Sequence, residues 1–139
     1  MRIEYQNMSE ANREVIRGAY QAFARGDVAY VIGMLDPNVE WLEAENFIYA
    51  DRNPYIGQQA VLEGVFLRLG SEWEGFTVTP EQIVADGDTV IGRGRYRGLC
   101  RATGKRVDAQ FAHVFQFKDG KVARFVQYTD TAQFLTAVA

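Results

Sequence analysis

The stretch RVDAQFAHVFQFKDGKVARFVQYTDT, residues 106–131, decides the fold of this chain. Apolar and polar residues alternate on both sides of Lys118-Asp119-Gly120, and a period of two is typical of β-strands. The Asp-Gly pair suits a tight turn, because glycine adopts the positive φ that hairpin turns demand. The stretch therefore predicts an antiparallel hairpin of strands 106–117 and 121–128.

The same pattern continues toward the N-terminus of this hairpin. Two further runs with a period of two, 76–85 and 89–97, are separated by Asp86-Gly87-Asp88, which is a second hairpin signal. The segment 98–105 contains Thr103-Gly104 and connects them to the first hairpin. Together the four runs predict an antiparallel meander.

Helical spacing of apolar residues appears before the meander and once after it. Ser9 is the expected N-cap of the first helix, and Gly26-Asp27 ends it and begins the second. A strand over 39–43 follows, with Val39, Trp41 and Glu43 on one side. Residues 44–56 are predicted to form a loop, with a little extended structure at 47–50. The predicted helices cover 9–25, 28–35, 57–69 (despite Gly64) and 131–138.

Helices followed by a meander are the order of an α+β domain, and 139 residues suit one domain, residues 1–139, with its own core. The long strand 106–117 must curl, and helices on one face make that face concave. A curved sheet closed by helices leaves a cavity, which is where a small organic ligand binds. Aromatic residues make up 13% of the chain, and they serve either the core or such a pocket.

Composition excludes several classes of function. A net charge of -3 provides no broad positive field for nucleic acid. No apolar stretch is long enough to span a bilayer, and the charged N-terminus lacks the apolar region of a secretory signal. The single cysteine, Cys100, and the single histidine form no recognisable metal site. We expect a cytoplasmic protein without metal, membrane or nucleic-acid partner.

Several segments resemble the SnoaL-like, ketosteroid-isomerase-related branch of the nuclear transport factor 2-like superfamily. The resemblance spans nearly the whole chain, and its ordered set of motifs is specific for the fold. The motifs are Gly26-Asp27, Asp36-Pro37-Asn38-Val39-Glu40-Trp41, Pro54-Tyr55-Ile56-Gly57, Asp86-Gly87-Asp88, and the runs Phe111 to Phe115, Asp119 to Val122 and Phe125 to Thr131. It implies a conical α+β barrel, helices packed on a strongly curved, mostly antiparallel sheet, and a homodimer through the outer sheet face.

The catalytic sets of two related activities are not matched. Steroid isomerases of this fold use an Asp base opposite an oxyanion hole that consists of a Tyr and a neutral Asp. Those positions fall on Trp41, on Ala19 (with Tyr20 one residue away) and on His113. Epoxide hydrolases of this fold use an Asp-Arg-Asp set, but Gln127 stands at the position of one Asp.

His113 is the first candidate for acid/base chemistry. It lies in an apolar run, shares a strand face with Phe111, and its ordinary pKa suits proton transfer near neutrality. The alternative is a neutral core histidine bonded to a backbone group or to Gln127 on the neighbouring strand.

Two carboxylates are candidate partners of His113. Asp130 stands where the last strand ends and the last helix begins, so it either caps that helix or lies at the pocket edge. Glu43 is flanked by aromatic residues, which would favour its neutral form in a pocket; the alternative is a solvated strand end. Asp108 has the opposite parity to His113 and is expected to face away.

The expected ligand-binding residues are Tyr20, Trp41, Phe111, Gln127 and Tyr96, each of which is alternatively a core residue. Arg93, Arg95 and Arg97 alternate on one strand face, where they either bind an anion or pair with carboxylates on a solvated or dimer-facing surface. We expect a cofactor-independent isomerase or cyclase acting on a small apolar carbonyl compound, with His113, Asp130 and Glu43 as catalytic residues. The alternatives are a non-catalytic ligand-binding domain and a dimerisation module whose cavity is filled by its own Phe side chains.

Overall fold

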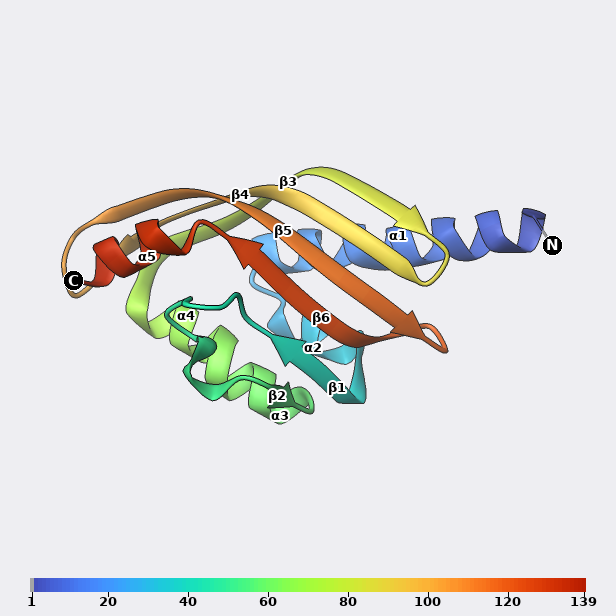
Figure 1. The fold of residues 1–139 in the computed structure, drawn as a ribbon, viewed down its shortest axis with the longest axis horizontal. Helices are drawn as coiled ribbons and strands as arrows, with labels where there is room; N and C mark the ends of the chain where they lie inside the picture. The colour runs from blue at the N-terminus through green and yellow to red at the C-terminus, as the bar shows by residue number, and fades with distance from the viewer. Residues whose placement is uncertain (1) are drawn as a thin grey trace.

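The computed structural model describes residues 2–139. One curved sheet arches over helices α1 to α4, and the short C-terminal helix α5 packs at one end of the sheet (Figure 1). The predicted α+β class, with helices packed on a curved and mostly antiparallel sheet, is confirmed. The cavity described below lies between the sheet and the helices, so the curvature of the sheet positions the site.

The sheet has six strands in the order β2-β1-β6-β5-β4-β3. The four C-terminal strands form the predicted antiparallel meander, and β1 pairs with β6 in parallel. The strands are β1 (Leu35–Leu42), β2 (Tyr55–Ile56), β3 (Trp73–Asp86), β4 (Thr89–Cys100), β5 (Arg106–Lys118) and β6 (Lys121–Thr129). Gly87 and Gly120 take positive φ in the two hairpins, as the Asp-Gly pairs require.

Helix α1 (Arg2–Ala24) begins well before the predicted start at Ser9, which is wrong as an N-cap. Ser9 lies inside the helix, where its Oγ donates to the Tyr5 carbonyl and accepts from the backbone N–H of Gly87 in the first hairpin of the meander. These contacts tie the helix to the sheet. The second helix, α2 (Val28–Gly33), begins as predicted, because the Asp27 carboxylate accepts from the Tyr30 N–H.

The first strand is longer than predicted, and the following loop contains structure of its own. β1 begins at Leu35 rather than at residue 39 and passes through Pro37. No strand forms at 47–50; the loop instead holds a 3-10 turn η1 (Ala50–Arg52) and the two-residue strand β2, which pairs with β1. The sequence gives little sign of so short a strand, because two residues show no periodicity.

The predicted third helix is continuous but not uniform. It consists of α3 (Gln58–Val61), the π-helical turn η2 (Leu62–Phe66) and α4 (Leu67–Glu72). A β-carbon at Gly64 would overlap the ring of Tyr55, so the helix approaches the aromatic ring closely at this point. Among residues 2–139, no helix is both long and apolar enough to cross a membrane.

Alternation along the strands separates an inner from an outer face. On β5, Val107, Ala109, Phe111, His113 and Phe115 are buried beneath the helices, whereas the residues between them are exposed or half-buried. α5 (Thr131–Val138) adds Phe134 to the same core. The inner face therefore carries both the hydrophobic core and the polar residues described next.

Candidate functional site

A row of residues across the inner face of the sheet forms the base of the site. His113 on β5 pairs with Gln127 on β6 and with Gly92 on β4. Glu43 directly follows Leu42, the last residue of β1, which pairs with Val126. The backbone N–H of Ala44 donates to Gln127 Oε1 (3.1 Å), so the end of β1 is fastened to the row.

Both ring nitrogens of His113 are bonded to tyrosine hydroxyls. Nδ1 lies 2.8 Å from the Tyr20 hydroxyl and Nε2 lies 2.5 Å from the Tyr96 hydroxyl. The ring also stacks on Phe111, with centroids 4.1 Å apart. Burial lowers the pKa of His113 to about 3, so the imidazole is neutral at physiological pH. Since both nitrogens are hydrogen-bonded, the ring orients the two hydroxyls.

Each tyrosine of this arrangement depends on a neighbour. Tyr20 comes from α1 and crosses to the sheet, where a β-carbon at Gly92 would overlap its hydroxyl. Tyr96 on β4 accepts a hydrogen bond from Gln127 Nε2 (3.0 Å). Burial raises the pKa of Tyr20 and of Tyr96 well above the ordinary value, so both hydroxyls keep their protons. The hydroxyls thus act as neutral hydrogen-bond donors.

Glu43 is a buried carboxyl with one strong partner. The residue is 4% exposed, and Oε2 accepts from Trp41 Nε1 at 3.1 Å. The backbone on either side is held by Asn53, whose amide bonds both the N–H and the C=O of Glu43. Burial raises the pKa of Glu43 to about 8, against the opposing effects of the Trp41 hydrogen bond and the Arg68 charge. A carboxyl poised near neutral pH can both take and give a proton.

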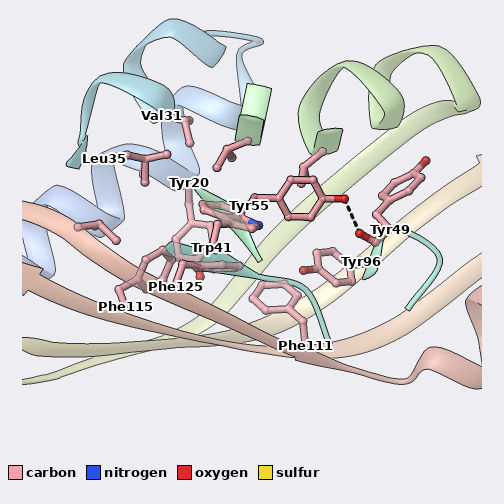
Figure 2. Close-up of a cluster of buried hydrophobic side chains, with 14 of the residues drawn as sticks. Tyr20, Val31, Leu35, Trp41, Tyr49, Tyr55, Tyr96, Phe111, Phe115 and Phe125 are labelled. Carbon is pink, nitrogen blue, oxygen red and sulfur yellow. Dashed lines mark hydrogen bonds between the residues drawn. The ribbon is translucent and has the colours of Figure 1, made fainter. Parts of the chain in front are cut away.

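These groups line one aromatic cavity of about 70 Å³ between the sheet and the helices. One ordered water needs only roughly 10–15 Å³, so the aromatic side chains leave real space here. Figure 2 shows Tyr20, Trp41, Phe115 and Phe125 gathered between the sheet and the helices, with Tyr96 and Phe111 farther along. Some of the lining residues on α1, the third helix and β3 are only half-buried: Phe23, Phe66, Leu69, Phe76 and Val78.

The structure brings most of the sequence-predicted site residues into this cavity, and separates two of them from it. The cavity is lined by Glu43, His113, Tyr20, Trp41, Gln127 and Tyr96. Phe111 lies behind His113, where it supports the ring. Asp130 is exposed at the start of α5; its carboxylate accepts from Gln133 and makes no capping bond to the helix backbone. A direct bond between His113 and a carboxylate is also not formed, because tyrosines occupy both nitrogens.

The arginine ladder lies on the outer face of the sheet and is paired. Arg93 bonds Glu81, whereas Arg95 and Arg97 both contact Asp108. Asp108 therefore points away from His113, as its parity predicts. No cluster of His, Cys, Asp or Glu capable of holding a metal ion occurs among residues 2–139.

Sequence reasoning missed Gly92 and Asn53. Gly92 belongs to the run GRGRYRG, residues 92–98, in which glycines alternate with arginines. A glycine inside a strand often marks the close approach of another group. Gly92 therefore indicates such an approach, but the sequence does not identify Tyr20 as the approaching group. Asn53 stands in the loop before β2 and has no sequence feature that connects it to Glu43.

Comparison with known proteins agrees with the fold. The model of the SnoaL-like domain matches residues 16–125. An NTF2-like protein from Burkholderia thailandensis is 36% identical, with a TM-score of 0.87, and the match covers 92% of this chain and 97% of that chain. A comparison with curated proteins gave no match.

Two more distant structures share the fold. TerC, co-crystallised with polyporic acid, is 23% identical with a TM-score of 0.81 over 92% of this chain and 98% of that chain. A protein from Jannaschia sp., described as a putative SnoaL-like polyketide cyclase, is 16% identical with a TM-score of 0.81 over 94% and 93%. The family model covers most of the chain, and the chain therefore belongs to the SnoaL-like domain family.

Proposed function

We propose that this protein is a cofactor-independent enzyme of the isomerase or cyclase type, which moves a proton on a small apolar carbonyl compound. The observation that carries the proposal is Glu43, a buried carboxyl with a pKa of about 8 at the wall of an aromatic cavity. Catalytic carboxylates are tuned toward neutral pH in this way, by burial among apolar groups. The fold relatives described as a polyketide cyclase and as a protein co-crystallised with polyporic acid lend the proposal support.

In the proposed reaction, the ionised Glu43 takes a proton from the carbon next to the carbonyl group. A hydroxyl of Tyr20 or Tyr96 donates to the carbonyl oxygen, on which negative charge develops as the enolate forms. Glu43 then returns the proton to another carbon. Alternatively, the enolate carbon attacks a second carbonyl and closes a ring, and the alkoxide oxygen that this forms takes up the proton held by Glu43. The roles differ from the sequence-based hypothesis: His113 is a positioning residue, and Glu43 alone is the catalytic carboxylate.

The experiment is hydrogen–deuterium exchange on a panel of small ketones that includes acetophenone, whose methyl protons lie next to the carbonyl group. Proton NMR in deuterated buffer follows loss of the methyl signal. We expect exchange above the buffer rate with the wild type and a loss of ~10²–10⁴-fold with Glu43→Gln, the usual contribution of a general base. Exchange at the same rate in both proteins would refute the proposal.

A second candidate is a ligand-binding domain without catalysis. It is favoured by one observation: both nitrogens of His113 are hydrogen-bonded to tyrosine hydroxyls. The imidazole is therefore not free to serve as a second acid/base group beside Glu43 in the cavity lining. Ketones that raise the melting temperature of the wild type, and yet exchange no protons, would support this candidate.

A homodimer through the outer sheet face is also proposed, on the basis of the family resemblance. Large apolar side chains are exposed there, Ile91 on β4 and Tyr128 on β6. Light scattering after size-exclusion chromatography tests the proposal. We expect twice the monomer mass for the wild type. We expect a lower mass for the double variant Ile91→Lys, Tyr128→Lys.

A further inference from the structure

The hydrogen atoms of the Tyr20–His113–Tyr96 group can be assigned one by one. The backbone N–H of Ala44 can only donate, so it fixes Oε1 of Gln127 as the acceptor on that side. The Gln127 amide nitrogen therefore faces Tyr96, and the Tyr96 oxygen accepts from it. Because the imidazole of His113 is neutral, one of its nitrogens donates and the other accepts.

Each tautomer of His113 leaves a different hydroxyl hydrogen without a partner. When Nδ1 carries the proton, it donates to the Tyr20 oxygen, and Tyr96 donates to Nε2; the Tyr20 hydrogen is then left over. When Nε2 carries the proton, it donates to the Tyr96 oxygen, and Tyr20 donates to Nδ1; the Tyr96 hydrogen is then left over. In both cases, one hydroxyl hydrogen has no acceptor among residues 2–139.

We propose that Tyr20, His113 and Tyr96 form a switchable donor, which gives one hydrogen bond to a ligand oxygen in the cavity from either tyrosine, according to the tautomer of His113. Buried polar hydrogens are nearly always paired, so the spare hydrogen calls for an acceptor. Both tyrosines line the cavity, where a ligand oxygen can reach them. The ligand class is therefore a small apolar molecule with an acceptor oxygen, such as a ketone. The inference rests on the proposed function only in placing the ligand in this cavity.

The first test reads the tautomer without any ligand. His113 is the only histidine, so protein labelled with nitrogen-15 histidine shows a single imidazole by NMR, and the protonated and unprotonated nitrogens differ widely in chemical shift. We expect averaged shifts in the wild type. Tyr20→Phe should fix the proton on Nε2 and Tyr96→Phe should fix it on Nδ1, because an N–H facing a phenyl ring would be unpaired.

The matched control is Tyr30→Phe, which removes a hydroxyl from an exposed tyrosine on α2 and should leave the shifts unchanged. A wild-type ring held in one tautomer, with both Phe variants keeping that same tautomer, would overturn the switch. Thermal unfolding checks that each variant is folded before its spectrum is interpreted.

The second test measures the donor directly with two probes of the same shape. Acetophenone has an acceptor oxygen where α-methylstyrene has a methylene group. We expect the wild type to prefer the ketone roughly tenfold, the usual consequence of one satisfied hydrogen bond in a buried site. Each single Phe variant should retain part of this preference, and the double variant Tyr20→Phe, Tyr96→Phe should lose it.

The outcomes separate this inference from the proposed function. Equal wild-type affinity for the two probes, or loss of the whole preference in one single variant, would overturn the switchable donor even if deuterium exchange occurs. A ketone preference that follows the expected order, with no exchange in the wild type, would keep the donor and refute the enzyme.

Discussion

Gly92 is matched to Tyr20: a β-carbon at position 92 would overlap the hydroxyl that bonds His113. The two residues come from β4 and α1, and the missing side chain of one makes room for the polar end of the other. Gly92→Ala should therefore push Tyr20 away from the imidazole and destabilise the protein by about 1–3 kcal/mol, the usual effect of overpacking. Urea unfolding measures the loss.

Gly70→Ala is the matched control, since nothing lies within 4 Å of a β-carbon there and the residue is in the helix α4. Alanine favours helix over glycine by roughly 0.5–1 kcal/mol, so this variant should be slightly more stable than the wild type. If Gly92→Ala were equally stable, the close fit between Gly92 and Tyr20 would be contradicted.

Glu43 makes stability fall as pH rises. Its pKa is about 8 in the folded protein and 4.5 in a free carboxyl, so between these values the unfolded state releases a proton that the folded state keeps. The contribution of Glu43 is fully present below pH 4.5 and is lost as pH rises through 8, by about 1.4 kcal/mol per pH unit. Glu43→Gln should remove this dependence, so the stability of the variant relative to the wild type should increase as pH rises.

Urea unfolding at several pH values between 5 and 8.5 measures the difference. Glu45→Gln serves as control, because it removes the same charge from an exposed position two residues away. Parallel stability curves for Glu43→Gln and the wild type would mean that Glu43 is ionised throughout, and that burial does not raise its pKa.

His113 has the opposite effect on the acid side. Its pKa is about 3 in the folded protein and 6.5 in a free imidazole. Between these pH values the unfolded state therefore binds a proton that the folded state does not bind. The stability that neutral His113 contributes is present above pH 6.5 and is lost as pH falls through 3. His113→Asn should be less stable than the wild type at pH 7 and should lose less on acidification. An equal acid loss in both proteins would contradict a buried, neutral imidazole.

The fold could be predicted from the sequence because its signals are local. The Asp-Gly pairs at 86–87 and 119–120 and the period of two around them define the meander, and the structure confirms it. β2 and the π-helical turn η2 could not be predicted in this way. The first depends on pairing with β1, and the second is an irregularity within one helix that no period in the sequence marks.

The site could be predicted only in part, for a similar reason. Alternation places His113 and Glu43 on the inner face, and the structure has both there. Their hydrogen-bond partners could not be predicted, because Tyr20 lies 93 residues from His113 along the chain. Parity says which way a side chain points, but it does not say what meets it. Asp130 is an example: its position at the end of a strand is compatible with a place at the pocket edge, but the residue is exposed.

Asp130 and Glu43 offer a direct contrast in activity. Asp130 lies outside the cavity lining, and its carboxylate accepts from Gln133. Asp130→Asn should therefore change deuterium exchange by less than about twofold, because the mutated group touches neither the ligand nor the site. Glu43→Gln should lose ~10²–10⁴-fold in the same assay. A large loss with Asp130→Asn would return that residue to the catalytic set and contradict the geometry.

Trp41 lowers the pKa of Glu43 and, in the proposed reaction, sets the pH at which Glu43 is ionised. Its indole N–H donates to Glu43 Oε2 and favours the charged form, so it holds the pKa of Glu43 below the value that burial alone would produce. Trp41→Phe keeps an aromatic ring against Phe125, whose centroid lies 3.7 Å from that of Trp41, but removes the donor. Because the proposed exchange requires ionised Glu43, the midpoint of its pH profile should move upward.

The control for this shift is Trp73→Phe, which alters the other tryptophan, also buried, whose N–H donates to Tyr49 instead. Both substitutions reduce packing and can lower the rate, but only the loss of the Trp41 donor should displace the midpoint. The position of the midpoint, not the height of the profile, is therefore the measurement. A midpoint that stays in place in Trp41→Phe would mean that a group other than Glu43 takes the proton.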